Sequence, residues 1–197
     1  DIIIGIQSGS DKLNMKLYNR YISSAQVVKA AEIINKFKDK LTVMYDIITC
    51  NPYEKPSDIV NLIHLLQKLP KPYYLSVNNL VFFPGTQMYR RAVVEGMIKS
   101  EKDSAAQLNY WDRSKHILLK RKNIYLNLIL NLMRGSVTEK RFGIMPNSIL
   151  NFLLKPERIN RNLKNQFPSI FAIRVVGVFD LIRERILKPA YRSLPVS

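Results

Sequence analysis

The sequence has 197 residues, of which 47% are hydrophobic, and it carries 31 Lys and Arg against 15 Asp and Glu. This apolar fraction excludes a wholly disordered chain, and the length suffices for one core or for one and a half domains. The single cysteine, Cys50, excludes an internal disulfide. Cys50 alone also cannot hold a structural zinc ion or an iron–sulfur cluster, which needs three or four thiolates.

The positive charge is concentrated in the second half of the chain. Residues 1–100 contain 13 Lys and Arg against 8 Asp and Glu, whereas residues 101–197 contain 18 against 7. This balance suits an anionic partner, such as nucleic acid or acidic lipid, and it equally suits a solvated surface that promotes solubility. Charge alone does not distinguish these alternatives.

Strands and helices alternate along the first hundred residues. Runs rich in β-branched and aromatic residues predict strands at 2–8, 41–49 and 73–83. Helical spacing of apolar residues, together with capping residues, predicts helices that begin at Ser10, Ser23, Ser57 and about Gln87. Strands joined through helices form parallel sheets, so the fold class is α/β, either doubly wound or barrel-like.

Polar or turn-forming loops follow each of these strands. They read QSGS, CNPYE and FPGT. In parallel α/β folds, ligands bind at the loops that lead from strands into helices. These three loops are therefore the expected location of a binding site.

Three motifs within residues 1–100 carry a family resemblance: IGIQSGSDKLNMKLYNRY, YDIITCNPYE and LVFFPGTQMYRRAVVEG. In this order and spacing, they resemble the second half of the partial (β/α)6 TIM-like barrel of radical S-adenosylmethionine (SAM) enzymes. The similarity is greatest to the bacterial group that carries an N-terminal cobalamin-binding domain. The family's CxxxCxxC loop is missing from the sequence. The resemblance therefore implies a fragment, with half of a barrel in residues 1–100 and a basic, mostly helical extension in residues 101–197.

The resemblance also implies an activity for the intact enzyme, in the cytoplasm of a bacterium. A [4Fe–4S] cluster would reduce SAM to give a 5′-deoxyadenosyl radical, which abstracts hydrogen from a substrate. Bound cobalamin would add methyl transfer or rearrangement. The cluster ligands and the cobalamin domain would lie outside this chain, and the missing barrel half would be its partner.

Five residues are candidate SAM contacts. By resemblance, Gln7 would bind ribose hydroxyls, Ser8 would reach the methionine part, and Arg20 would pair with the SAM carboxylate. Asp46 would bind the ribose diol, and Ile48, on the same strand face, would pack against adenine. A turn-closing Gln and a surface Arg are the structural alternatives. Both assignments on the second strand require Asp46 to point away from the outer helix layer.

Two polar residues next to these candidates receive structural interpretations. Glu54 is expected to cap or anchor the loop before the next helix. Cys50, at the end of the second strand, is interpreted as a small buried side chain. Neither is included in the predicted site.

The second half of the chain has a different character. Asn123, Asn127 and Asn131 are spaced four apart, which predicts a helix that packs on two sides. The stretch FAIRVVGVFDLIRERILKP is too short and too charged to cross a bilayer. We expect it to dock on the missing barrel half or on a neighbouring domain, and a helix on the membrane surface is the alternative.

Two other functions remain open. A methylthiotransferase-like RNA-modifying enzyme shares the QSGSD turn, but such an enzyme would end in a small β-barrel, and the tail here reads as helix. A non-catalytic module that binds membranes or nucleic acid would explain the basic tail without using the strand-end loops. Nucleic acid is the disfavoured partner, whereas peripheral membrane contact through the basic helices stays open.

Overall fold

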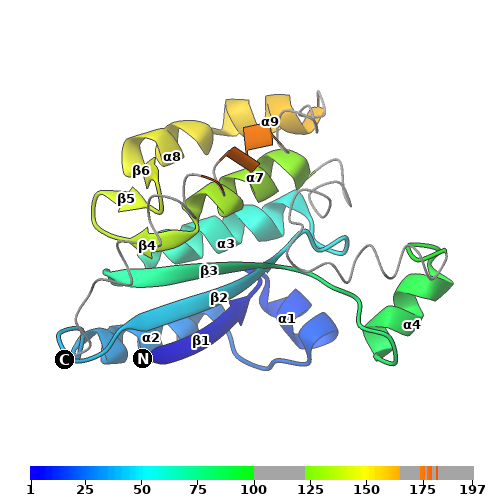
Figure 1. Cartoon of the computed structure of the whole chain (residues 1–197), viewed down its shortest axis with the longest axis horizontal. Coiled ribbons are helices and arrows are strands. Elements are labelled where there is room, and N and C mark those ends of the chain that lie inside the picture. The colour runs from blue at the N-terminus through cyan, green and yellow to red at the C-terminus, as the bar shows by residue number, and fades with distance from the viewer. Residues whose placement is uncertain (100–122, 165–173, 176, 179–180, 182–197) are drawn as a thin grey trace.

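The computed structural model describes residues 1–99, 123–164, 174–175, 177–178 and 181. It is a mixed α/β structure built on one open sheet whose strands follow the order β1 to β6 (Figure 1). The α/β class is confirmed. The described sheet is not closed into a barrel.

The three long strands are those predicted from the sequence, each with slightly shorter bounds. They are β1 (Ile2–Gln7), β2 (Val43–Thr49) and β3 (Tyr73–Asn79). Both neighbouring pairs are parallel, and Asp46 in the central strand lies opposite Gly5 of β1 and Ser76 of β3. The carboxyl ends of all three strands therefore lie along the same edge of the sheet.

The helices of the first hundred residues begin at local capping interactions. They are α1 (Asp11–Tyr18), α2 (Ser24–Asn35), α3 (Pro56–Lys68) and α4 (Gln87–Val94). Ser10 caps α1 by accepting a hydrogen bond from the Leu13 N–H, and Ser23 caps α2 in a capping box with Gln26.

The predicted cap of α3 is wrong. This helix begins one residue before Ser57, at Pro56, and the capping position belongs to Lys55. The Asp58 carboxylate accepts a hydrogen bond from the Lys55 backbone N–H at 2.9 Å. Proline suits the first helical position because its missing N–H needs no partner there.

One face of the sheet is covered by helices. Strands β2 and β3 alternate between buried and half-buried residues, and the buried set packs against α2, α3 and α7 (Ile124–Met133). The largest fully buried side chains of this core include Tyr45, Ile47, Leu62, Leu66 and Leu75. Burial of apolar surface here is the main source of stability. We call this side of the sheet the covered face.

Of the three asparagines spaced four apart, Asn123 and Asn127 bind the end of β2 and the loop after it, whereas the Asn131 amide donates to the Asn127 carbonyl within α7. Asn127 accepts a hydrogen bond from the Thr49 hydroxyl at 2.9 Å, and the Asn123 amide donates to the Glu54 carbonyl at 3.0 Å. All three asparagines are buried. The prediction that this helix packs on more than one side is confirmed.

Short strands that the sequence did not predict follow α7. They are β4 (Gly135–Val137), β5 (Arg141–Phe142) and β6 (Met145–Pro146), and β4 extends the sheet by pairing antiparallel with β3. Helices α8 (Asn147–Leu153) and α9 (Pro156–Lys164) then pack beside α7 (Figure 1). The extension is therefore not helical throughout. Most of the FAIRVVGVFDLIRERILKP stretch lies outside the described residues.

Candidate functional site

The candidate site lies on the side of the sheet opposite the covered face. The residues that alternate with the core on β1, β2 and β3 are half-buried or exposed. We call this side the uncovered face, and its members are Ile3, Gly5, Gln7, Met44, Asp46, Ile48, Tyr74, Ser76 and Asn78. Polar side chains gather on it toward the carboxyl ends of the strands.

Gln7 ends β1 in an uncommon backbone conformation. Its φ is 66°, and the Ser8 N–H donates to the Ile6 carbonyl at 2.9 Å, which closes a three-residue turn. The register with β2 shifts between Gly5 and Gln7. A non-glycine residue in the left-handed region is strained, and such strain is typical of functional sites.

Gly5 provides the space in which two predicted site residues meet. A Cβ atom at this position would clash with the Gln7 amide nitrogen and with an Arg20 guanidinium nitrogen. Arg20 Nη1 also donates a hydrogen bond to the Gly5 carbonyl at 2.9 Å. The amide and the guanidinium therefore lie side by side over the β1 backbone, on the uncovered face.

The end of α1 directs Arg20 to this position. Asn19 terminates the helix with a φ of 53°, and the Arg20 N–H donates to the Asn14 carbonyl at 3.0 Å. The Asn14 amide in turn donates to the carbonyls of Ile6 and Ser8, at 3.2 and 3.1 Å. Asn14 thus ties α1 to the end of β1 and sets where the chain leaves the helix.

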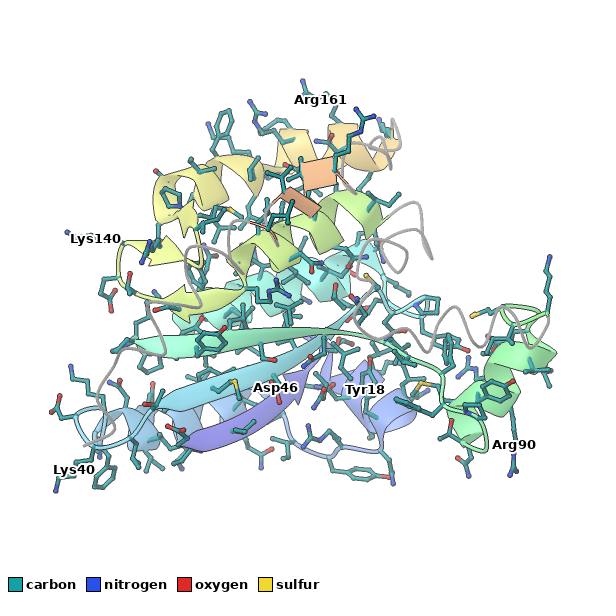
Figure 2. The ribbon with its side chains drawn as sticks, in the orientation of Figure 1. Tyr18, Lys40, Asp46, Arg90, Lys140 and Arg161 are labelled. Atoms are coloured by element: carbon teal, nitrogen blue, oxygen red, sulfur yellow. The ribbon has the colours of Figure 1, made fainter. Side chains whose placement is uncertain are left out.

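Asp46 completes the group on the neighbouring strand. It is the direct partner of Gly5 in the register, and Figure 2 labels it on β2. Within the described part of the chain, no hydrogen bond or ion pair engages its carboxylate. Two residues further along the same face, Ile48 packs against a small apolar cluster formed by Leu80, Phe82, Ala92 and Ile98.

The structure places Ser8 apart from the other predicted site residues. Its side chain is fully buried, and its hydroxyl donates to Glu54 Oε1 at 2.7 Å. Glu54, also fully buried, anchors the loop after β2 to the turn after β1, in agreement with its structural interpretation. Gly9 allows this turn to lie against α3, because a Cβ there would clash with the Leu62 backbone nitrogen.

Tyr18 closes this buried network beside Glu54. Burial, reinforced by the Glu54 carboxylate, raises the pKa of the Tyr18 phenol well above its ordinary value of 10, although the hydrogen bond from Asn51 opposes the shift. That bond, from Asn51 Nδ2 to the Tyr18 hydroxyl, measures 2.9 Å. The phenol therefore stays neutral and acts as a structural link between α1 and the loop after β2.

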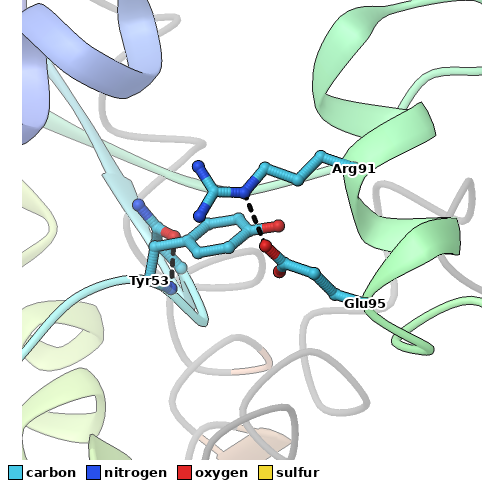
Figure 3. A network of polar contacts seen from close by, with 4 residues as sticks. Tyr53, Arg91 and Glu95 are labelled. Atoms are coloured by element: carbon cyan, nitrogen blue, oxygen red, sulfur yellow. Dashed lines mark hydrogen bonds and ion pairs between the residues drawn. The ribbon is translucent and has the colours of Figure 1, made fainter.

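A second interaction, which sequence analysis did not identify, attaches α4 to the same loop. The Arg91 guanidinium lies over the Tyr53 ring at 4.4 Å from its centroid, and Arg91 Nε pairs with Glu95 at 2.7 Å (Figure 3). Burial and the adjacent Glu95 carboxylate raise the pKa of Tyr53 to about 12. The spacing of Arg91 and Glu95 on a helix was visible in the sequence, but their contact with Tyr53 was not.

Cys50 does not offer a metal-binding group. Burial raises the pKa of its thiol to about 12, and the side chain packs against Ile124 and Leu128. In the ranges that the structure describes, no three His, Cys, Asp or Glu side chains gather as a metal site. The one cysteine of this chain cannot by itself hold an iron–sulfur cluster, which needs three or four thiolates.

A pocket of about 180 Å³ lies at the opposite end of the strands. Its lining comes from the amino ends of β2 and β3 and their neighbours: Lys38, Leu41, Thr42, Val43, Pro72, Tyr73, Tyr74 and Ser136. In parallel α/β folds, catalysis is located at the carboxyl ends of the strands, and the amino ends serve stability. We therefore place the candidate site at the Gln7, Arg20 and Asp46 group and not in this pocket.

Comparison with protein-family models finds no match to this sequence, and comparison with curated proteins finds no significant relative. Of the helices that the structure describes, none combines the length and apolar character needed to cross a bilayer.

Proposed function

We propose that this chain is the SAM-binding half of a cytoplasmic radical SAM enzyme, and that Gln7, Arg20 and Asp46 contact SAM. The observation that supports the proposal best is that the Gln7 and Arg20 side chains meet over Gly5, whose register partner on the next strand is Asp46. The three residues come from β1, from the segment after α1 and from β2, yet all lie on one face toward the carboxyl ends of parallel strands. Binding sites in such sheets are expected there.

The three polar groups have the chemistry that parts of SAM require. A carboxylate such as Asp46 can accept hydrogen bonds from both hydroxyls of a ribose diol. Arg20 donates through Nη1 to the Gly5 carbonyl, and its other N–H groups suit a carboxylate. The Gln7 amide can both donate and accept. Ile48 would supply an apolar contact to adenine, and Ser8 supports the turn through Glu54.

The proposal assigns the cluster ligands and the cobalamin-binding domain to segments outside this chain. Cys50 cannot supply a cluster by itself, and its buried thiol is not a ligand in this arrangement. When bound, SAM and the cluster would supply the radical chemistry, with methyl transfer or rearrangement as the reaction classes in the cobalamin-dependent case. This chain's own residues bind and orient SAM.

Equilibrium binding of SAM to the full-length enzyme tests this proposal. Asp46→Ala should weaken binding by about 1 to 3 kcal/mol, the range for losing a charged hydrogen-bond partner. Asp39→Ala is the matched control, because Asp39 is an exposed carboxylate in the turn that follows α2. Unchanged affinity in a folded Asp46→Ala variant would remove Asp46 from the site.

A further inference from the structure

We propose that α8 and α9 form a surface that binds membranes containing anionic lipids. At intervals of three residues from position 149 to position 164 lie two apolar and four cationic side chains, five of them exposed and one half-buried. We call this set the α8–α9 stripe, and it consists of Ile149, Phe152, Lys155, Arg158, Arg161 and Lys164. The proposal is independent of the SAM site.

The apolar end of the stripe is turned away from the core. Ile149 is 49% exposed and Phe152 is 45% exposed, whereas Leu150, between them in sequence, is fully buried. On α9, Ile159 packs against the core and thus fixes which side of the helix faces inward. Ile149 and Phe152 are thus neighbours on the solvent side of α8, three residues apart, and neither is part of the core.

The cationic side chains of the α8–α9 stripe begin directly beside the exposed ring of Phe152. Arg158 Cζ lies 3.5 Å from the centroid of Phe152, and Lys155 Nζ lies 5.7 Å from it. Arg161 and Lys164 follow in the last turn of α9. Residues 139–164 contain six Lys and Arg against two Glu, so the positive charge has little local compensation.

A bilayer interface matches both ends of the stripe. Apolar side chains of an interfacial helix enter the boundary between headgroups and acyl chains, and basic side chains meet the lipid phosphates. The phosphates of a nucleic acid could also bind these basic side chains, but its bases would need exposed aromatic rings for stacking. Here Arg158 covers one face of the Phe152 ring, and Ile149 has no ring to offer.

The position of the stripe leaves the SAM site accessible. Helix α9 packs against α7, which in turn packs against α3 on the covered face. Figure 2 places Arg161 and Lys140 on the helical side of the molecule, away from Asp46 on β2. Membrane contact through α8 and α9 would therefore not block the uncovered face.

Vesicle flotation of the 197-residue chain tests this inference. We expect it to float with vesicles that contain phosphatidylglycerol in phosphatidylcholine, to float much less with phosphatidylcholine alone, and to be released by high salt. The variant Lys155→Glu, Arg158→Glu and Arg161→Glu should lower the partition coefficient about 100-fold or more, from the typical contribution of a basic residue near an anionic surface. The variant Ile149→Ser and Phe152→Ser should lower it about tenfold.

The matched control places the same charge reversals elsewhere. Lys36, Lys38 and Lys40 lie exposed at the end of α2, and reversing them changes the net charge equally. This control should retain most of the binding, and circular dichroism should show that all variants are folded. The proposal is overturned if anionic vesicles do not bind the chain, or if both charge variants lose binding equally. It is also overturned if single-stranded RNA binds in a manner that depends on the stripe while vesicles do not.

Discussion

The two faces of the β1–β3 sheet are built from alternate residues of the same strands, yet they have opposite compositions. On the covered face, β2 and β3 contribute mainly apolar side chains, such as Tyr45, Ile47 and Leu75, that are almost fully buried. On the uncovered face, the same strands present Asp46, Ser76 and other residues that are only half-buried.

The difference follows from the cost of burying polar groups. A carboxylate within the helix-packed core would need a compensating partner, as Glu54 has in Ser8. Asp46 keeps access to solvent and has no such requirement. The uncovered face can therefore hold reactive or binding groups without a large loss of stability, whereas substitutions on the covered face should be costly.

The largest expected effect is the loss of a core side chain. Leu66→Ala should lower the free energy of unfolding by about 2 to 5 kcal/mol, because Leu66 is fully buried and truncation leaves a cavity. Met44→Ala, on the uncovered face, should cost about 1 kcal/mol or less. Chemical denaturation measures both values. Equal losses would contradict the distinction between the faces.

A smaller effect is expected at the turn after β1. Ser8→Ala removes the hydroxyl that donates to Glu54 Oε1 within the buried network, which should cost about 1 to 3 kcal/mol of stability. Ser57→Ala serves as the control, since Ser57 is exposed and is not the cap of α3. Thermal unfolding compares the two variants. A neutral Ser8→Ala would argue against a structural role for this contact.

The smallest expected effect is a gain in stability, whereas the two preceding substitutions lower it. Gln7→Gly should raise stability by up to about 1 kcal/mol, because glycine adopts a positive φ without the steric cost that other residues incur. Under the proposed function, the same variant should bind SAM more weakly. A variant that is less stable, or one that binds SAM normally, would show that the conformation of Gln7 is not maintained for binding.

Much of the fold could be predicted from local patterns. The strands and helices of the first hundred residues are long enough to show period-two or helical repeats, and their caps are local. The strands β4, β5 and β6 contain only two or three residues, which is too short for alternation to be visible. Of the three, β4 pairs with β3, which lies far away in the sequence, and β5 and β6 are added to β4 in turn.

The candidate site was predictable only in part. Alternation along a strand implies that Gln7 and Ser8 point to opposite sides, so the separation of Ser8 from the site could have been found. The position of the Arg20 side chain over Gly5 could not have been predicted, because it depends on the turn at Asn19 and on the hydrogen bonds that Asn14 makes. These are tertiary contacts without a sequence pattern.

Under the proposed function, hydrogen exchange of the intact enzyme with and without SAM tests the central claim most directly. The account predicts slower amide exchange at residues 5–8 and 46–50, the carboxyl ends of β1 and β2, when SAM is saturating. It predicts no change at residues 71–74, beside the pocket at the amino ends. Protection at that pocket alone, or no protection at the strand ends despite saturating SAM, would contradict the proposed binding site.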